Sequence, residues 1–292
     1  MGSASVQTYQ GVMGRQTPQY ESLYKLALPL PALGVHRMAR PTLDRRLGLL
    51  GSTMLGIGAT IGTSIFVIIG KAADMAGPAI IVSFLLAGAA ALFTALDYAE
   101  LGSSVPEAGG GYTFVFKAMG GSTAYLTGCF MWFGNIFYAA FCALGFATAI
   151  RGFLPTGFPL DLLAPVIVLL FFGINMFGSR ETGRTQVVLT AALLAVLITF
   201  MVTGANHIQA VNYEPFVPMG IGSIFAAAGF VYVAYVGFEI ICTASEEIVV
   251  AGKTVPRAII LSMLISAAIY LSVVAVAVGV LPYKEIAESD AP

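Results

Sequence analysis

Apolar runs of about twenty residues recur along most of this chain, and they constrain its fold more than any other feature. A run of this length can cross a hydrocarbon core about 30 Å thick as a helix, which satisfies its own backbone hydrogen bonds as lipid requires. Only 10% of the residues are charged, whereas a soluble domain carries about 25%. The runs do not alternate between polar and apolar residues, which disfavours a transmembrane β-barrel. The sequence therefore predicts an all-α, polytopic membrane protein, a transmembrane helix bundle.

About seven spans follow from these runs. Their approximate ranges are 46–76, 78–101, 122–150, 162–178, 185–204, 221–247 and 256–281. Residues 1–40 are polar and aperiodic, and we expect them to form a disordered or interfacial tail before a transmembrane domain at 41–292. If the spans alternate in direction, nine Lys and Arg residues lie on the side of the N-terminus and three on the other. The positive-inside rule then predicts a multi-pass protein of the cell membrane with a cytoplasmic N-terminus.

The first span contains an unusual stretch, GIGATIGTSIF, at residues 56–66. Each glycine inside a helix costs about 1 kcal/mol relative to alanine, and a helix that breaks within lipid survives only where the break lines a cavity. At such a break, the helix beginning near Thr63 and Ser64 would offer N–H donors to an anion. The helix ending near Thr60 would offer carbonyl oxygens to a cation. One break could therefore hold both ends of a zwitterion.

Close helix packing is the alternative explanation of these glycines. Gly58 and Gly62 have the four-residue spacing of small residues that lets two membrane helices approach each other. The sixth span favours the first explanation, because Gly237 lies at its centre and Glu239 follows at membrane depth, where an ionisable residue usually faces a cavity or a partner. Two interrupted spans in corresponding positions of two halves indicate a transporter site.

Three motifs carry a resemblance to a known family. GIGATIGTSIF, YAELGSSVPEAGGGYTFVFKAMGG and VAYVGFE followed by SEE resemble the amino acid–polyamine–organocation superfamily, in particular amino acid permeases with the LeuT-type fold. The similarity extends over about residues 44–282. It implies an inverted repeat, with a first half at about 44–204 and an incomplete second half at about 220–292. It also implies that helices one and six are discontinuous, with unwound or hinge positions at Gly58, Gly62 and Gly237.

The resemblance further implies a substrate site. The substrate carboxylate would bind the amides of Gly62, Thr63 and Ser64. The amine would bind backbone carbonyls of Thr60, Val233, Ala234 and Val236, with Glu239 close by. Tyr138, in an aromatic stretch of the third span, is the expected wall residue, because a buried Tyr hydroxyl needs a partner, although helix packing would also explain it.

This chain departs from the family pattern in three places. Ser64 stands where the first motif usually has Gly. Leu193 stands where several proton-coupled relatives carry a Lys, so we do not expect coupling through that ammonium, and sodium, proton or exchange coupling stay open. The chain has seven of the family's ten core helices, so we expect a fragment, with bare apolar faces on the sixth and seventh spans.

The predicted function is secondary transport of an amino acid by alternating access. Alternatives are transport of another organocation or polyamine, and an inactive fragment of such a permease. A membrane enzyme is disfavoured, because the sequence has no Ser/His/Asp or Cys/His set and no clustered metal ligands. No cofactor is expected, and no basic patch with interleaved aromatics points to nucleic acid. The expected partners are an amino acid and the lipid bilayer; the sequence does not indicate which amino acid, or the oligomeric state.

Overall fold

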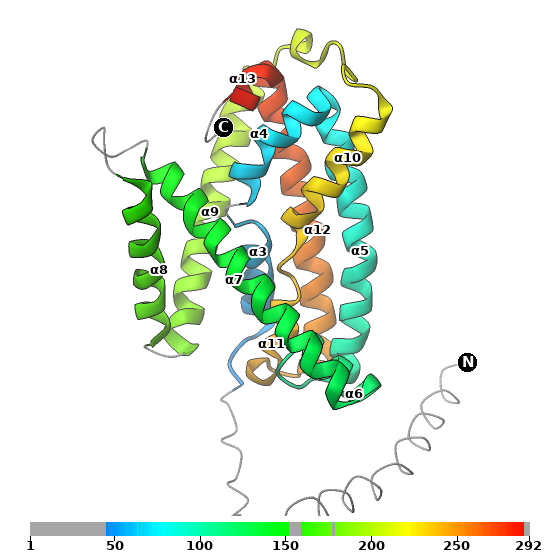
Figure 1. The fold of residues 1–292 in the computed structure, drawn as a ribbon, viewed down its shortest axis with the longest axis vertical. Coiled ribbons are helices and arrows are strands. Elements are labelled where there is room, and N and C mark those ends of the chain that lie inside the picture. Colours follow the sequence, from blue (N-terminus) through cyan, green and yellow to red (C-terminus); the bar gives the residue numbers. More distant parts are fainter. Residues whose placement is uncertain (1–44, 63, 152–158, 177–178, 289–292) are drawn as a thin grey trace, which may run out of the picture. The chain divides into compact units, whose positions relative to one another are not determined.

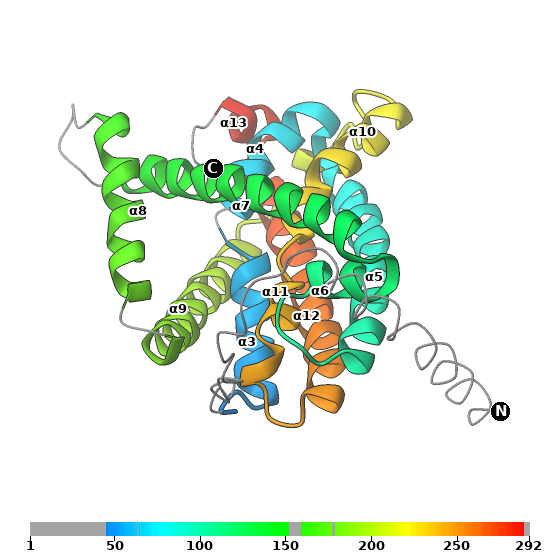
Figure 2. The same cartoon turned by 60° about the horizontal axis from the view of Figure 1, so that its bottom comes forward.

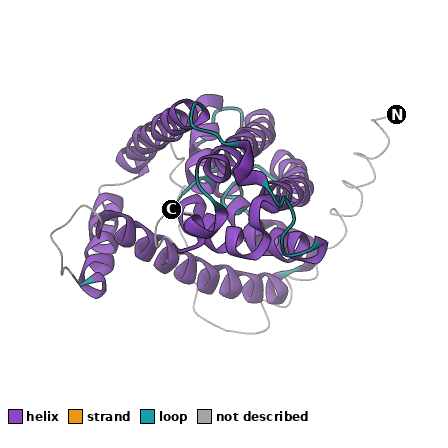
Figure 3. Ribbon diagram, turned by 90° about the horizontal axis from the view of Figure 1, so that it is seen from above, coloured by secondary structure: helices purple, strands orange, loops and turns teal. Residues whose placement is uncertain are grey.

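A computed structural model describes residues 45–62, 64–151, 159–176 and 179–288. The predicted N-terminal tail lies outside these residues. Within them the elements are helical, with no named strand (Figures 1 and 3). The α-helices are α3 (Leu49–Thr60), α4 (Ser64–Ala76), α5 (Ile80–Ser104), α6 (Gly111–Met119), α7 (Gly121–Arg151), α8 (Leu160–Met176), α9 (Ser179–Ala205), α10 (Ile221–Val231), α11 (Ile240–Thr243), α12 (Ala251–Val280) and α13 (Tyr283–Glu288). Short 3-10 turns are η1 (Gly77–Ala79), η2 (Ala210–Tyr213), η3 (Tyr232–Tyr235) and η4 (Ser245–Glu247).

Each predicted span corresponds to helix in the structure. Helices α3 and α4 form the first span, α5 the second, α7 to α9 the next three, α10 and α11 the sixth, and α12 the seventh. Five helical stretches are long and apolar enough to cross a membrane, one of which joins α4 to α5 through η1. Helices α3 and α8 are apolar but shorter. The all-α prediction is confirmed for the described residues, whereas the division into two repeats stays a prediction.

Helix α12 lies at the centre of the bundle (Figure 1). It packs along α5 and α3 and also contacts α9, while α10 covers α5 and α4. Small residues allow these close approaches. A Cβ atom on Gly56 would lie 2.8 Å from the Ser262 Cβ, and one on Gly102 would lie 2.8 Å from a Val255 methyl group. The helices that carry the interrupted spans are thus held against a continuous buried core.

Exposed apolar side chains lie on the sixth and seventh spans, as expected, and more extensively on other helices. Phe225 on α10 and Leu264 on α12 are exposed. In their most apolar windows, α7 and α9 are 11% buried, whereas α12 and the α10–α11 span are 44% buried. The reason is that α12 has neighbours on several sides, whereas α7 crosses the outside of the bundle and α8 stands beside it at the edge (Figure 2).

Backbone contacts show which loops share an end of the bundle. At one end, the Arg46 N–H donates to the Glu247 carbonyl at 2.9 Å, and the Val249 N–H donates to the Leu47 carbonyl at 2.9 Å. At the other end, the Asn212 side chain donates to the Gly279 carbonyl at 2.8 Å. The beginning of α3 therefore lies beside η4, and the end of α12 lies beside η2.

This arrangement generates a topology prediction. Ser104, at the end of α5, and His207, after α9, are both exposed and should lie on opposite faces of the membrane. In inverted and right-side-out vesicles, a membrane-impermeant maleimide should modify Ser104→Cys only from the cytoplasmic side and His207→Cys only from the outside. The unsubstituted chain, whose own Cys residues lie within spans, is the control. Labelling of both variants from one side would contradict the topology.

Candidate functional site

The first helix break separates α3 from α4. Helix α3 ends at Thr60, Ile61 leaves the helical conformation at φ −84° and ψ 38°, and α4 begins at Ser64. These bounds agree with the predicted interruption. A Cβ atom built on Gly62 would have no neighbour closer than 4.0 Å, so the space beside this glycine is open. Thr63 lies outside the described residues.

The second break lies in the sixth span. Helix α10 ends at Val231, and one 3-10 turn follows before Val236 adopts an extended conformation at φ −72° and ψ 140°. Gly237 then has a φ of +136°, which side-chain-bearing residues rarely adopt. The Glu239 carboxylate accepts a hydrogen bond from the Gly237 N–H at 2.8 Å, so this acid satisfies an amide that the break leaves without a helical partner.

The two breaks lie against each other. A Cβ atom on Gly237 would come within 2.5 Å of the Ala59 carbonyl oxygen and 2.8 Å of the Thr60 nitrogen. Real Cβ atoms do not approach backbone so closely, so only glycine permits this contact. The last turn of α3 therefore packs directly on the backbone of the sixth span. The shared site expected from the sequence requires the two breaks to lie next to each other, and the structure places them in direct contact.

A residue that the sequence analysis missed connects the two breaks. The Tyr270 hydroxyl, on α12, lies 2.7 Å from the Thr60 carbonyl oxygen and 2.8 Å from the Ala234 carbonyl oxygen. It also lies 3.3 Å from the Ser64 hydroxyl. The Tyr270 side chain is fully buried. A Tyr within an apolar span is a signal in itself, because its buried hydroxyl needs a partner.

The predicted amine-binding carbonyls are not equally available. The Thr60 carbonyl oxygen lies 2.7 Å from the Tyr270 hydroxyl and 3.3 Å from the Ser64 hydroxyl, so two hydroxyl groups already face it. The Ala234 carbonyl accepts from Tyr270, and the Val233 carbonyl accepts from the Val236 N–H at 3.3 Å. A ligand amine would therefore compete with two hydroxyl groups at the Thr60 carbonyl, but with only one donor each at the Val233 and Ala234 carbonyls. The binding roles of these residues stay predictions.

Gly58 does not belong to the break. It lies inside α3, and a Cβ atom there would collide with the side chains of Thr190 and Gln186 on α9. The prediction that Gly58 is an unwound or hinge position is therefore wrong. Its role is the close helix packing that was the alternative explanation, which holds for Gly58 and not for Gly62.

Helix α7 contributes Tyr138 near the breaks. Its hydroxyl is buried and forms no hydrogen bond with a nitrogen or oxygen atom of the described residues. Helix α7, which carries Tyr138, contacts α4, the second half of the first span. The role of Tyr138 as a wall residue of the site stays a prediction.

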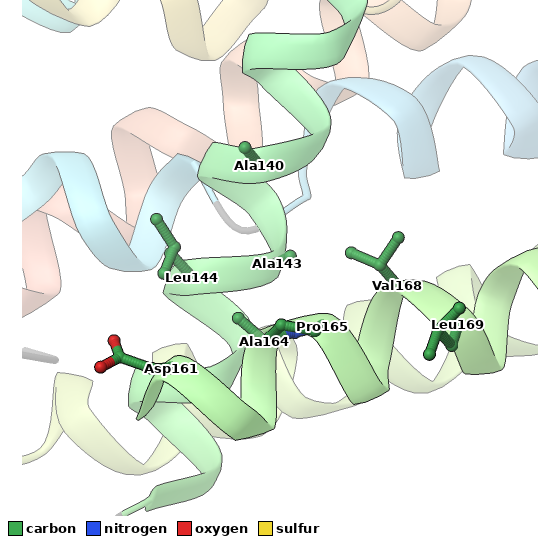
Figure 4. Close-up of a pocket in the computed structure, with 8 residues that line it drawn as sticks. All are labelled: Ala140, Ala143, Leu144, Asp161, Ala164, Pro165, Val168 and Leu169. Carbon is green, nitrogen blue, oxygen red and sulfur yellow. The ribbon is translucent and has the colours of Figure 1, made fainter. Parts of the chain in front are cut away.

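An open groove between α7 and α8 is a separate feature (Figure 4). Its lining is almost entirely apolar, and the Asp161 carboxylate points outward at its edge; the lining residues are Ala140, Ala143, Leu144, Asp161, Ala164, Pro165, Val168 and Leu169. No residue of either break lines this groove. A ligand site usually combines apolar walls with several convergent polar groups, and these are found at the breaks. The described residues also contain no group of three or more His, Cys, Asp or Glu suited to a metal.

Comparison with known proteins identifies the family. The profile of the amino acid permease family matches residues 51–290, which is most of the chain. This chain belongs to the amino acid permease family. The resemblance found in the three motifs is thereby confirmed, and the apolar helices are those of a multi-pass membrane protein of that family.

Named relatives of this permease-family chain differ in what they transport. It is 35% identical over 271 residues to the branched-chain amino acid permease BcaP of Bacillus subtilis, covering 86% of this chain and 58% of that protein. It is 34% identical over 280 residues to the methylthioribose transporter of the same organism, covering 90% and 60%. It is 31% identical over 295 residues to the chloroplastic cationic amino acid transporter 9 of Arabidopsis thaliana, covering 93% and 52%. The chain thus spans between half and two thirds of the length of these relatives.

The contact between the breaks generates a stability prediction. Gly237→Ala should destabilise the protein, because the new methyl group meets backbone atoms that cannot move aside and the residue keeps a φ of +136°. Such backbone strain costs about 1–3 kcal/mol. Gly222→Ala on α10 is the matched control, since a Cβ there meets nothing within 4 Å. Thermal unfolding in nanodiscs, followed by the fluorescence of Trp132, should show a lower Tm for the first variant alone; equal Tm values would contradict the contact.

Proposed function

We propose that the two adjacent breaks form the substrate site of a secondary transporter that moves amino acids by alternating access. The observation that carries this proposal is the contact of Gly237 with the last turn of α3, which brings two sets of non-helical backbone groups together inside a membrane bundle. Broken helices at membrane depth are characteristic of transporter sites. The names of two relatives, a branched-chain amino acid permease and a cationic amino acid transporter, support an amino acid as the substrate.

The substrate carboxylate would bind at the beginning of α4. The amides of Gly62, Thr63 and Ser64 precede or open this 13-residue helix, whose N-terminus carries a partial positive charge. The first turn of α4 contains no acidic side chain that would compete for these amides. The open space beside Gly62 allows a ligand to approach the backbone closely.

The substrate amine would bind toward the second break. Two hydroxyl groups face the Thr60 carbonyl, whereas the Val233 and Ala234 carbonyls each face one donor, so the carbonyls of the second break are the better acceptors. Glu239, which is half-buried beside Gly237, adds a negative charge at that end of the site. The zwitterion would therefore lie across the two breaks rather than within the first one.

Alternating access would use the breaks as hinges. The first and sixth spans would rock against a scaffold formed by α7, α8 and their partners, and the short half-helices on either side of each break can tilt with few changes of backbone angle. The distribution of Lys and Arg supports a cytoplasmic N-terminus in the cell membrane. Leu193 packs against the apolar core where several proton-coupled members of the family carry a Lys, so proton coupling through a Lys ammonium at this position is not expected.

A second candidate substrate is a sugar derivative. The methylthioribose transporter matches 90% of this chain at 34% identity, which is as similar as the amino acid permeases are. Such a ligand would use the same open space but would not need a carboxylate at the beginning of α4. Substrates with and without a carboxylate therefore distinguish the two candidates.

The test is binding of radiolabelled L-leucine to the 292-residue chain in nanodiscs. Leucinamide, which lacks the carboxylate charge, should compete roughly ten- to a hundred-fold less well, because a hydrogen bond to a charged group contributes about 1.5–3 kcal/mol. Gly62→Val should abolish binding by filling the open space, whereas Gly222→Val, the same change at an open position on α10, should not. Equal competition by leucinamide would contradict the carboxylate site, and binding of methylthioribose without leucine would favour the second candidate.

A further inference from the structure

Four groups form what we call the joint between the two breaks. They are the Thr60 and Ala234 carbonyl oxygens, the Ser64 hydroxyl and the Tyr270 hydroxyl. The Tyr270 oxygen lies 2.7 Å and 2.8 Å from the two carbonyl oxygens. These carbonyls belong to segments 174 residues apart, at the end of α3 and in η3. All four residues of the joint are fully buried.

A hydroxyl group has one proton, and here two carbonyl oxygens compete for it. The Ser64 hydroxyl lies 3.3 Å from both the Tyr270 oxygen and the Thr60 carbonyl, so it contributes one more proton at longer range. Several oxygen atoms thus lie around one point, and their partial negative charges favour a partial positive charge there. In discontinuous membrane helices, carbonyls at the ends of half-helices characteristically coordinate a cation.

We propose that the Tyr270 hydroxyl takes the place of a monovalent cation at this joint, so that the two breaks are held together without sodium. The hydroxyl shares its one proton between a carbonyl from each break, and without it both carbonyls would be desolvated at considerable cost in free energy. Because it is covalently part of α12, it also fixes both breaks to the central helix of the bundle. This inference concerns the stability of the joint and does not depend on what the site transports.

Removal of the hydroxyl alone would leave an oxygen-lined site. Tyr270→Phe keeps the ring, which packs against Phe84 and Tyr235 at centroid distances of 5.7 Å and 5.1 Å. The Thr60 and Ala234 carbonyls and the Ser64 hydroxyl would remain. Thr60 adds a further oxygen, that of its side chain, which is buried and has no hydrogen-bond partner among the described residues. Hard monovalent cations prefer such oxygen ligands.

Tyr235 provides a matched control. It is also buried, and its hydroxyl also donates to a backbone carbonyl, that of Phe84 at 2.9 Å. The Phe84 carbonyl lies within the continuous helix α5 and not at a break. Tyr235→Phe therefore removes a comparable hydroxyl and hydrogen bond without exposing the carbonyls of the joint.

The experiment compares the Tm of the 292-residue chain and its variants in sodium chloride and in choline chloride at equal concentration, since choline is too large to enter the joint. The unsubstituted chain should have the same Tm in both salts. Tyr270→Phe should have a lower Tm in choline chloride and recover by about 3–6 °C in sodium chloride. Tyr235→Phe should lose a few degrees equally in both salts.

Three outcomes would overturn the proposal. The first is a sodium-dependent rise in the Tm of the unsubstituted chain, which would mean that a cation already serves the joint. The second is a Tyr270→Phe variant whose Tm responds to sodium no more than that of Tyr235→Phe. The third is a Tyr270→Phe variant that fails to fold in both salts while Tyr235→Phe folds, because sodium should have restored the joint. The first outcome concerns only the Tm of the unsubstituted chain in the two salts, so it can be decided whether or not the Tyr270→Phe variant folds.

Discussion

The constraint on which this structure depends is that lipid cannot satisfy backbone polar groups. A helix that stops within the membrane leaves N–H and carbonyl groups without partners, and each unsatisfied group costs several kcal/mol in hydrocarbon. Here two such interruptions lie in contact, and the residues around them supply partners for several of these groups. Gly237 packs on the last turn of α3, Glu239 accepts from the Gly237 amide, and the Tyr270 hydroxyl shares its proton between a carbonyl of each break. The backbone groups at the breaks that are left without a partner are the ones that a ligand can bind.

The position of α12 explains why the joint is stable while other faces are bare. This helix lies against α5, α3 and α9, so a side chain on its inner face is fixed from several directions. Tyr270 is held rigidly by this packing, and its hydroxyl contacts the last residue of α3 and the 3-10 turn η3, where the two helices are interrupted. Helices α7 and α8, in contrast, carry the exposed apolar groove and hold few polar groups in place. The breaks therefore combine a rigidly held backbone with backbone groups that are available to a ligand.

The sequence predicted the helices and both breaks, because apolar run length and clustered glycines act locally. It did not assign the glycines correctly one by one. Gly58 and Gly62 share a spacing, yet Gly58 packs against Thr190 on α9 while Gly62 borders open space, and only the neighbour distinguishes them. Tyr270 was missed for the same reason, since its partner at Thr60 is 210 residues away along the chain. Contacts between distant segments decide these roles, and one sequence does not contain them.

The central claim is that both breaks together bind the substrate. Hydrogen–deuterium exchange of the chain in nanodiscs, with and without saturating L-leucine, tests it directly, because exchange reports on individual backbone amides. Binding should slow exchange in two separate segments, residues 61–65 and 233–239, and leave the groove-lining segments 140–144 and 161–169 unchanged. Protection limited to one break would contradict a shared site. Protection at the groove between α7 and α8, with neither break affected, would place the substrate elsewhere and contradict the claim entirely.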